Sequence, residues 1–447
     1  MEWPKLISGK RLGLKCSNPE EIGRSVYQRD YDAIIFSSSF RRLQDKAQVF
    51  PLAKSDYVRT RLTHSLEVSC VGRSLGQLVG EYLKSTDKIP RELAASEIGN
   101  IVAAACLAHD IGNPPFGHNG EKAIQEWFTT KTGKSALEEL TAQERADFEG
   151  FEGNAQGFRI LTRLQNTDNE GGLQLTCATL ATFTKYPRPA SMKCAEHPSH
   201  TGKGSKKYGY FVGEARLFEE VAEEVGLPRR HLECSGWVRH PLVFLVEAAD
   251  DICYGINDIE DGYRLRHISF QEAVDLLKPI SPKSELTKYD SILEDEDKIS
   301  YLRAKAIKEL IIQVVDSFRR HEKEILSGEF DSSLTSTVSC KNSLKAIEDV
   351  SQDKIYTARE VLEVEIPGYD VLGGLLEAFV PAVEETAKGE ATARRRGIYR
   401  LLPKAIQRKL KTEEKYCRLL RITDFVSGMT DSYAVSLYKQ IKGISLP

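Results

Sequence analysis

The chain has 447 residues, which is enough for one large domain or for two or three ordinary ones. Hydrophobic residues make up 41% of it and charged residues 28%, a composition typical of a globular protein with a sizeable core. The formal net charge is −3, so no overall basic field attracts nucleic acid, and any anion site must be built from local groups.

The N-terminal stretch MEWPKLISGKRLGLKC lacks the continuous apolar run that a signal peptide needs. No segment approaches the roughly 18 apolar residues expected of a membrane span. The nine cysteines are scattered and include no CxxC pair, which indicates reduced, buried thiols. We therefore expect a soluble, cytoplasmic protein that does not contact a membrane.

Helical spacing of apolar residues recurs along the chain, whereas alternating strand patterns are scarce. We predict an all-α fold with helices over residues 58–82, 97–109, 154–166, 171–185, 240–262, 300–326, 341–364, 369–387 and 412–442. Polar or Gly/Pro/Ser-rich breaks lie near residues 128–150, 186–210, 279–297 and 328–340. The break at 186–210 is long for a structureless loop, and loops of that length are usually disordered or functional lids.

His109 and Asp110 end one apolar run and open a turn rich in glycine and proline. Because the backbone leaves helical geometry there, both side chains can turn toward one point. His64 and Asp250 lie in two other apolar helical segments. A lone histidine in such a helix is more often a hydrogen-bonded core residue than a ligand, and an Asp-Asp pair in a helix is usually solvated.

Several observations favour a metal over these alternatives. Buried carboxylates are costly unless they are paired or coordinate a cation, and no Lys or Arg stands beside Asp110 or Asp250 in the sequence. Two imidazoles and two carboxylates form a mixed N/O set that suits a hydrolytic divalent metal with open coordination positions. We therefore predict a metal-dependent phosphohydrolase with ligands His64, His109, Asp110 and Asp250.

The turn after Asp110 is expected to be rigid, because Gly112 and Gly117 allow unusual backbone angles and two prolines fix the path between them. It would present His118 and Glu121 beside the metal, where a His–Glu pair at i, i+3 can act as a proton donor and its orienting carboxylate. Glu121 also suits the first turn of a helix, and both interpretations can hold.

On the third segment, Asp250, Tyr254 and Asp258 fall at i, i+4 and i+8 and so share one helix face. Asp251 points about 100° away from Asp250, so only one of the two can ligate easily.

These residues closely resemble the HD-domain deoxynucleoside triphosphate triphosphohydrolases, the dGTPase family. The HD pair alone is shared by many phosphohydrolases, whereas the NPPFGHNGE turn joined to the Asp250–Tyr254–Asp258 face is much more specific. The matching strings run in family order over about residues 20–440 and are RDYDAIIFSSSFRRLQDKAQVFP, RTRLTHSLEVS, CLAHDIGNPPFGHNGE, FEGNAQGFRILTRL, HPLVFLVEAADDICYGINDIED and DFVSGMTDSYA.

The resemblance implies an HD-domain helical core with additional C-terminal helices. We expect residues 1–270 to form the metal-dependent catalytic region and residues 271–447 a helical region packed on it, or the two to form one continuous domain. The resemblance also implies metal ligation by the four residues named above and a catalytic role for His118 with its acidic partner Glu121.

Other positions match the family's substrate pocket. Gln48 and Val49 match the pair that packs against the deoxyribose, where a 2'-hydroxyl would clash, and Tyr254 and Asp258 match the positions that hold the 3' side of the sugar. Arg61 matches an arginine on the phosphates.

Lys185 and Lys207 resemble the cations that grip the polyphosphate, with the choice between Lys206 and Lys207 open. In this family water attacks the α-phosphorus of dGTP or of dNTPs broadly, giving a deoxynucleoside and inorganic triphosphate. The resemblance further implies a divalent cofactor, Mn or Mg first and Fe, Co, Ni or Zn as alternatives. It also implies a homo-oligomer, often a hexamer, and a nucleotide or single-stranded DNA effector.

Two further clusters are open to a functional interpretation. Cys194, His197 and His200 lie within seven residues of each other but offer only three zinc ligands in a Gly/Ser/Pro-rich setting. The arginines 394–396 could contact phosphate, although a solvated helix end or a subunit contact is the more common use of such a run.

Two alternative functions remain open at this stage. One is another HD phosphohydrolase acting on (p)ppGpp or a cyclic nucleotide, which would need no pocket that rejects the 2'-hydroxyl. The other is a catalytically silent nucleotide- or DNA-binding regulator, against which the complete set of expected catalytic residues argues.

Overall fold

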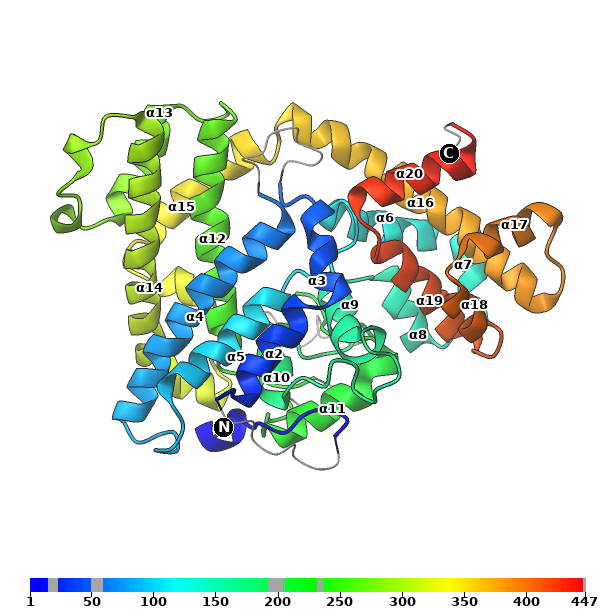
Figure 1. Ribbon diagram of the computed structural model, residues 1–447, viewed down its shortest axis with the longest axis horizontal. Coiled ribbons are helices and arrows are strands. Elements are labelled where there is room, and N and C mark those ends of the chain that lie inside the picture. Colours follow the sequence, from blue (N-terminus) through cyan, green and yellow to red (C-terminus); the bar gives the residue numbers. More distant parts are fainter. Residues whose placement is uncertain (15–22, 50–58, 192–203, 205, 231–235, 445–447) are drawn as a thin grey trace.

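The computed structural model describes residues 1–14, 23–49, 59–191, 204, 206–230 and 236–444. Within these residues the protein is built from helices, and extended segments form only isolated bridges rather than strands (Figure 1). The predicted all-α class is confirmed. The Cys194, His197 and His200 cluster, considered above as a zinc site with too few ligands, lies outside the described residues.

The helices of the first half are α1 Trp3–Leu6, α2 Val26–Ile35, α3 Ser38–Arg42, α4 Arg61–Ser85, α5 Ala95–Ala108, α6 Gly117–Thr129, α7 Lys131–Leu137, α8 Ala142–Glu149, α9 Gly153–Arg159, α10 Cys177–Phe183 and α11 Ala215–Glu224. Those of the second half are α12 Val243–Arg264, α13 Phe270–Leu277, α14 Asp295–Ser327, α15 Lys341–Val350, α16 Arg359–Lys388, α17 Ala393–Leu401, α18 Lys404–Leu410, α19 Lys415–Ser427 and α20 Asp431–Lys442. Single π-helical turns, Ile160–Leu164 and Ser351–Ile355, extend α9 and α15.

The helices that carry the predicted ligands form where apolar spacing predicted them, as α4, α5 and α12. The predicted break at 128–150 is wrong, because α7 and α8 lie within it. The predicted gap between residues 364 and 369 is also wrong, because α16 continues through Pro367. The predicted helix 412–442 is two helices, and Thr430 caps the second by accepting a hydrogen bond from the backbone N–H of Tyr433.

A stripe of glycines lets α4 and α5 approach closely. A Cβ on Gly76 would lie 2.8 Å from the carbonyl oxygen of Ile98, and one on Gly80 only 2.3 Å from that of Ala95. Only glycine permits backbones this close. The two helices therefore pack as one unit, with His64 near the start of α4 and His109 at the end of α5.

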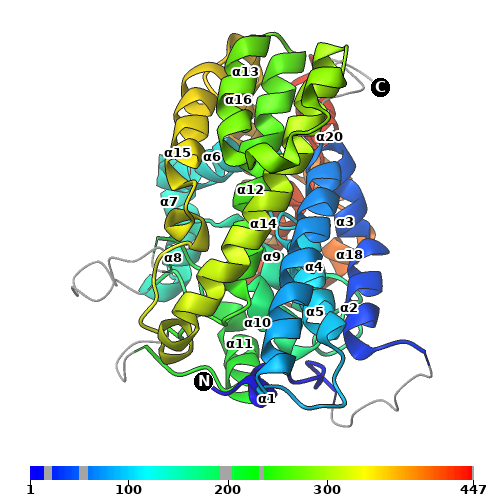
Figure 2. The same cartoon turned by 90° about the vertical axis from the view of Figure 1, so that its left-hand side faces the viewer.

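Buried apolar side chains gather in two cores. The larger is built mainly on α2, α4, α5, α10, α12 and α14, and the smaller on α6, α8, α16, α19 and α20. Figure 2 shows α4, α12 and α14 side by side in the larger core, and Figure 1 shows the helices of the smaller core on the other side of the molecule. A division of the chain near residue 270 stays a prediction.

Among the described residues, α16 is the one helix long and apolar enough to cross a membrane by length and composition, which the sequence pattern had not indicated. In its most apolar stretch, 56% of the residues are buried inside the protein. It packs against α6, α17, α19 and α20, as a core helix does.

Candidate active site

Three of the four predicted ligands converge at the junction of α4, α5 and α12. The Nε2 atom of His64 lies 3.1 Å from Oδ1 of Asp250, and Nε2 of His109 lies 3.6 Å from the same oxygen. One ligand atom from each of these residues lies within 4.8 Å of the others. Asp251 lies outside this cluster, as its position on the helix predicted, and accepts a hydrogen bond from Thr335, although it lines the same cavity as Asp250.

Asp110 adjoins this cluster but has partners of its own. Its Oδ1 lies 3.5 Å from Nε2 of His109 and accepts a 2.6 Å hydrogen bond from the amide of Asn113. Its Oδ2 accepts a 2.7 Å hydrogen bond from the guanidinium of Arg61. Asp110 has no arginine beside it in the sequence, but the fold supplies one, because one turn of α4 separates Arg61 from His64 and brings both toward the HD pair.

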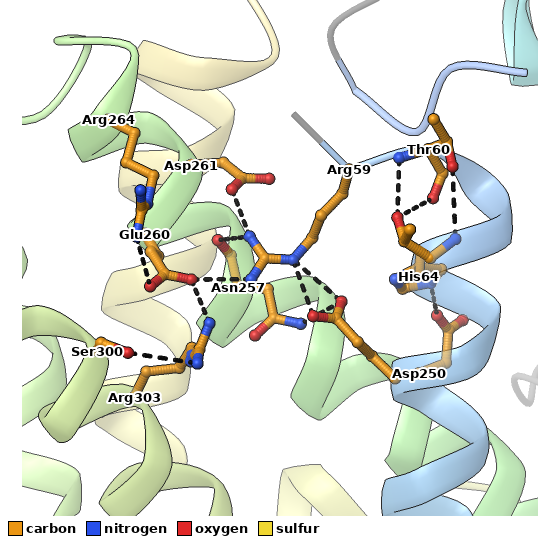
Figure 3. A network of polar contacts seen from close by, with 12 residues as sticks. Arg59, Thr60, His64, Asp250, Asn257, Glu260, Asp261, Arg264, Ser300 and Arg303 are labelled. Atoms are coloured by element: carbon orange, nitrogen blue, oxygen red, sulfur yellow. Dashed lines mark hydrogen bonds and ion pairs between the residues drawn. The ribbon is translucent and has the colours of Figure 1, made fainter. Parts of the chain in front are cut away.

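An arginine immediately before α4 ties this helix to α12. The Arg59 guanidinium contacts Glu260 and Asp261 on α12 (Figure 3). It also contacts Glu67 on α4. Asn257 donates a further hydrogen bond to Glu67. These contacts fix the register of the two helices and so hold His64 opposite Asp250.

The charges around the cluster keep its carboxylates ionised. Burial disfavours the charged form of Asp110, but Arg61 and then His109 favour it more strongly, and the pKa of Asp110 falls to about 2. Desolvation also opposes ionisation of Asp250, yet His109 and the hydrogen bond with His64 lower its pKa. The carboxylates of Asp110 and Asp250 are thus anionic at neutral pH and suited to bind a cation.

The turn that follows Asp110 is tight for two different reasons. Phe116 and Gly117 both adopt positive φ, 63° and 57°. Gly112 does not have a positive φ. Only glycine fits there because a Cβ would lie 2.1 Å from the carbonyl oxygen of Gly153. The Phe116 N–H donates to Asp431 on α20, which anchors the strained residue from the C-terminal region.

His118 and Glu121 form the expected pair on the first turns of α6. Nδ1 of His118 lies 2.8 Å from Oε2 of Glu121, whose Oε1 accepts a hydrogen bond from the N–H of Gly153. Glu121 is buried, whereas 71% of the His118 side-chain surface is exposed. Despite burial, the His118 contact lowers the pKa of Glu121, so the carboxylate is fixed and the imidazole above it is free to meet a substrate.

A cavity of about 350 Å³ opens in front of these groups, a size in the range of small-molecule sites. Nine of the thirteen predicted site residues line it. They are Gln48, Arg61, His109, Asp110, His118, Lys185, Lys207, Asp250 and Tyr254. The other four, Val49, His64, Glu121 and Asp258, are not part of its lining.

Each predicted lysine is held by a carboxylate that the sequence interpretation missed. Lys207 Nζ lies 3.0 Å from Glu152 and 3.5 Å from Glu121, and Lys185 Nζ lies 3.3 Å from Glu247. Glu152 is the N-cap of α9 and lies within the string FEGNAQ. Its place in that string was the one signal in the sequence that could have pointed to it. Lys206 does not line the cavity, so the geometry favours Lys207 of the two candidates.

Of the four residues matched to the sugar pocket, Gln48 and Tyr254 line the cavity. Gln48 has a buried Oε1 with no hydrogen-bond partner among the described residues, and Val49 is half-buried against the larger core. The ring of Tyr254 stacks on Tyr356, with centroids 5.3 Å apart. Tyr356 donates a 2.6 Å hydrogen bond to Asp258, and burial raises the pKa of that carboxyl to about 7.

The donor set fits a divalent metal. Two imidazole nitrogens and an ionised carboxylate point at one another, with a second ionised carboxylate at the rim. Such a mixed N/O set is the kind that hydrolytic metal ions use. The Cys106 carbonyl lies 2.7 Å from Nδ1 of His109, which leaves Nε2 of that ring directed at Asp250 and Asp110. Nitrogen and carboxylate atoms gathered in this way are suited to hold a cation between them.

Comparisons with known proteins agree with this geometry. The HD domain matches residues 61–157, and the Phosphohydrolase-associated domain matches residues 334–440. The chain is 46% identical to a deoxyguanosinetriphosphate triphosphohydrolase-like protein of Synechocystis sp. over the full length of both. It is 39% identical to one of Pseudomonas aeruginosa, also over both full lengths, and 31% identical to the deoxyguanosinetriphosphate triphosphohydrolase of Klebsiella pneumoniae over 94% of each.

The helical fold, the His–Asp cluster and the HD match define a phosphohydrolase of the metal-dependent HD class. Within that class, the chain belongs to the family of deoxyguanosinetriphosphate triphosphohydrolases and their like proteins, as its full-length identity to these relatives shows. The second matched region contains Tyr356 and Asp431, whose side chains reach the site from the C-terminal half.

Proposed function

We propose that the protein hydrolyses deoxynucleoside triphosphates, dGTP or dNTPs broadly, to deoxynucleoside and inorganic triphosphate. The observation that carries the proposal is one cavity that joins the His–Asp cluster, the His118–Glu121 pair and two lysines. The names of the chain's relatives refer to deoxyguanosine triphosphate, which belongs to the same substrate class.

In this proposal His64, His109, Asp110 and Asp250 hold a divalent cation, Mn or Mg first, with Fe, Co, Ni or Zn as alternatives. When bound, such an ion lowers the pKa of a coordinated water and offsets charge on the α-phosphoryl group. Arg61 keeps Asp110 ionised through their hydrogen bond and adds positive charge on the side where the phosphates lie.

His118 donates a proton to the departing 5'-oxygen, and Glu121 orients its ring. The support is the 2.8 Å contact between the two residues and the exposure of the imidazole to the cavity. The leaving group is the deoxynucleoside, because water attacks the α-phosphorus and the bond that breaks joins this phosphorus to the 5'-oxygen. The triphosphate remains intact.

Lys185 and Lys207 bind the triphosphate. In the described protein they pair with Glu247 and Glu152, so substrate phosphates would replace carboxylates as their partners. Gln48 and Val49 pack against the deoxyribose, and the Oε1 of Gln48, which has no hydrogen-bond partner among the described residues, serves as an acceptor. Tyr254 and Asp258 hold the 3' side of the sugar.

Product identification tests the proposal. Purified protein is incubated with each dNTP and with GTP, in Mn²⁺ and in Mg²⁺, with and without single-stranded DNA. We expect deoxynucleoside and triphosphate from at least one dNTP and much slower turnover of GTP. Release of pyrophosphate or monophosphate, or equal rates for dGTP and GTP, would exclude this function.

We further propose a cytoplasmic homo-oligomer, a hexamer by the habit of the family, whose activity responds to a nucleotide or to single-stranded DNA. Light scattering during size-exclusion chromatography measures the assembly directly. The arms of the product assay that contain DNA measure the effector response.

A further inference from the structure

A second cavity, of about 600 Å³, lies away from the active site between α3, α9 with its π-helical extension, α18, and the α19–α20 junction. Its lining shares no residue with the active-site cavity. Its volume falls in the range of sites for drug-sized molecules. Apolar side chains contribute much of its wall, namely Ile160, Leu164, Ile406, Phe425, Met429 and Tyr433.

Four charged side chains also line this cavity, and two of them are already neutralised. Arg421 forms 3.0 Å hydrogen bonds with the carboxylate of Glu413. Asp424 accepts hydrogen bonds of 2.8 and 2.9 Å from Arg159. Neither pair leaves a net charge for a ligand.

The other two, Arg42 and Lys409, are half-buried cations that form no ion pair with any carboxylate in the described part of the chain. Within the described residues, the Arg42 guanidinium donates a 2.9 Å hydrogen bond to the hydroxyl of Ser39. Burial lowers the pKa of Arg42, and no carboxylate offsets this cost. An anion in the cavity would supply the missing partner.

We propose that this cavity binds a small organic acid, with an apolar or aromatic body against the wall and one carboxylate or sulfonate group on Arg42. Lys409 provides a second, weaker electrostatic contact. Two unpaired cations match one or two negative charges, whereas a nucleoside triphosphate carries three to four and would leave charge uncompensated. The proposal is independent of the proposed hydrolysis, because it concerns other residues and another kind of ligand.

Titration of the full-length protein with 1-anilinonaphthalene-8-sulfonate, an aromatic sulfonate whose fluorescence rises in apolar surroundings, tests the site without metal or nucleotide. We expect one saturable site per chain. Arg42→Met, which keeps the length of the side chain and removes its charge, should weaken binding about tenfold. Ala405→Trp, which fills the cavity from the exposed side of α18, should abolish it.

Arg408→Met is the matched control, because Arg408 is an exposed neighbour of Lys409 on α18 and does not line the cavity. It should bind the probe like the wild type. Thermal melting followed by circular dichroism confirms that each variant folds. If Arg42→Met does not fold, Ala405→Trp and Lys409→Met, which lie at the surface of α18, decide the question by the same titration.

Three outcomes would overturn the assignment. If Ala405→Trp and a folded cation variant, Arg42→Met or Lys409→Met, both bind the probe with unchanged affinity, the probe binds elsewhere. Displacement of the probe by a dNTP with the same dependence on Arg42 would make the occupant a nucleotide. Probe affinity that falls as protein concentration rises would show that a second copy of the chain covers the cavity.

Discussion

His118 has a close structural counterpart elsewhere in the chain, which makes its proposed role easy to isolate. His321 on α14 forms the same i, i+3 contact, with Nδ1 2.9 Å from Glu324, but lies outside the active-site cavity. His118→Ala should retain metal and lower kcat by about 10²-fold or more, the usual loss for a proton-transfer group. His321→Ala should change kcat little. Metal content and initial rates on the preferred dNTP measure both, and normal turnover by His118→Ala would contradict the role.

Asp250 and its neighbour Asp251 provide an equally direct test of the metal site. The Asp250 carboxylate lies in the His64–His109 cluster, whereas that of Asp251 accepts a hydrogen bond from Thr335. Asp250→Asn should therefore lose bound metal and activity together, because an amide is a poor metal ligand compared with a carboxylate. Asp251→Asn should keep its metal. Elemental analysis after dialysis gives the metal per chain, and equal metal in the two variants would show that the ligand set is wrong.

At the scale of secondary structure, a buried carboxyl links α8 to α19. Asp147 accepts hydrogen bonds from the hydroxyl of Tyr416 at 2.6 Å and from the N–H of Val212 at 2.9 Å. Burial outweighs these bonds and raises the pKa of Asp147 to about 7. The folded protein therefore binds this proton more tightly than the unfolded chain does.

This raised pKa sets the sign of a pH dependence. The stabilisation from the bound proton is complete below the unfolded pKa, near 4, and is lost as the pH rises toward 7 and above. Asp147→Asn carries no such proton. Between pH 5 and pH 8 its free energy of unfolding should therefore rise relative to that of the wild type, by about 1 kcal/mol or more. Urea denaturation at the two pH values measures the difference. Glu149→Gln, the same charge change at an exposed position of α8, should show no such trend.

The helices that could be predicted from the sequence are those whose apolar spacing is long and regular. This holds for α4, α5 and α12, and with them for the convergence of His64, His109 and Asp250. The short, polar α8 was missed, although Thr141 and Glu144 form a capping box that the sequence displays. The predicted gap between residues 364 and 369 contains Pro367, but packing of α16 against α6 and the C-terminal helices maintains the helix through it.

The contacts that complete the site could not be predicted, because they join residues far apart in the chain. Lys207 meets Glu152 across 55 residues, and Tyr356 meets Asp258 across 98. Helical periodicity places a side chain on a face but does not say which distant element covers that face. The roles assigned to the thirteen site residues accordingly stay predictions, while their clustering around one cavity is a property of the fold.

For the whole molecule, the active site depends on the C-terminal helices, and Asp431 at the start of α20 ties them to the segments that carry Gln48 and His118. One of its oxygens accepts a 3.0 Å hydrogen bond from the N–H of Ala47, next to Gln48, and the other accepts one of the same length from the N–H of Phe116. The side chain is buried, so no water can replace it without rearrangement. The C-terminal region thus positions both the predicted sugar contact and the turn that carries His118.

Asp431→Ala should therefore impair stability and activity at once. It leaves two backbone N–H groups without acceptors, at a cost of about 1–3 kcal/mol each. Because Phe116 needs an anchor to keep its positive φ, His118 loses its fixed position, and kcat should fall even at temperatures where the variant is folded. Ser432→Ala removes only an exposed 2.9 Å hydrogen bond to Asp45 and should change stability by less than about 0.5 kcal/mol. Calorimetry and kcat for the pair decide the point: if Asp431→Ala were as active as Ser432→Ala, the C-terminal helices would cover the site without shaping it.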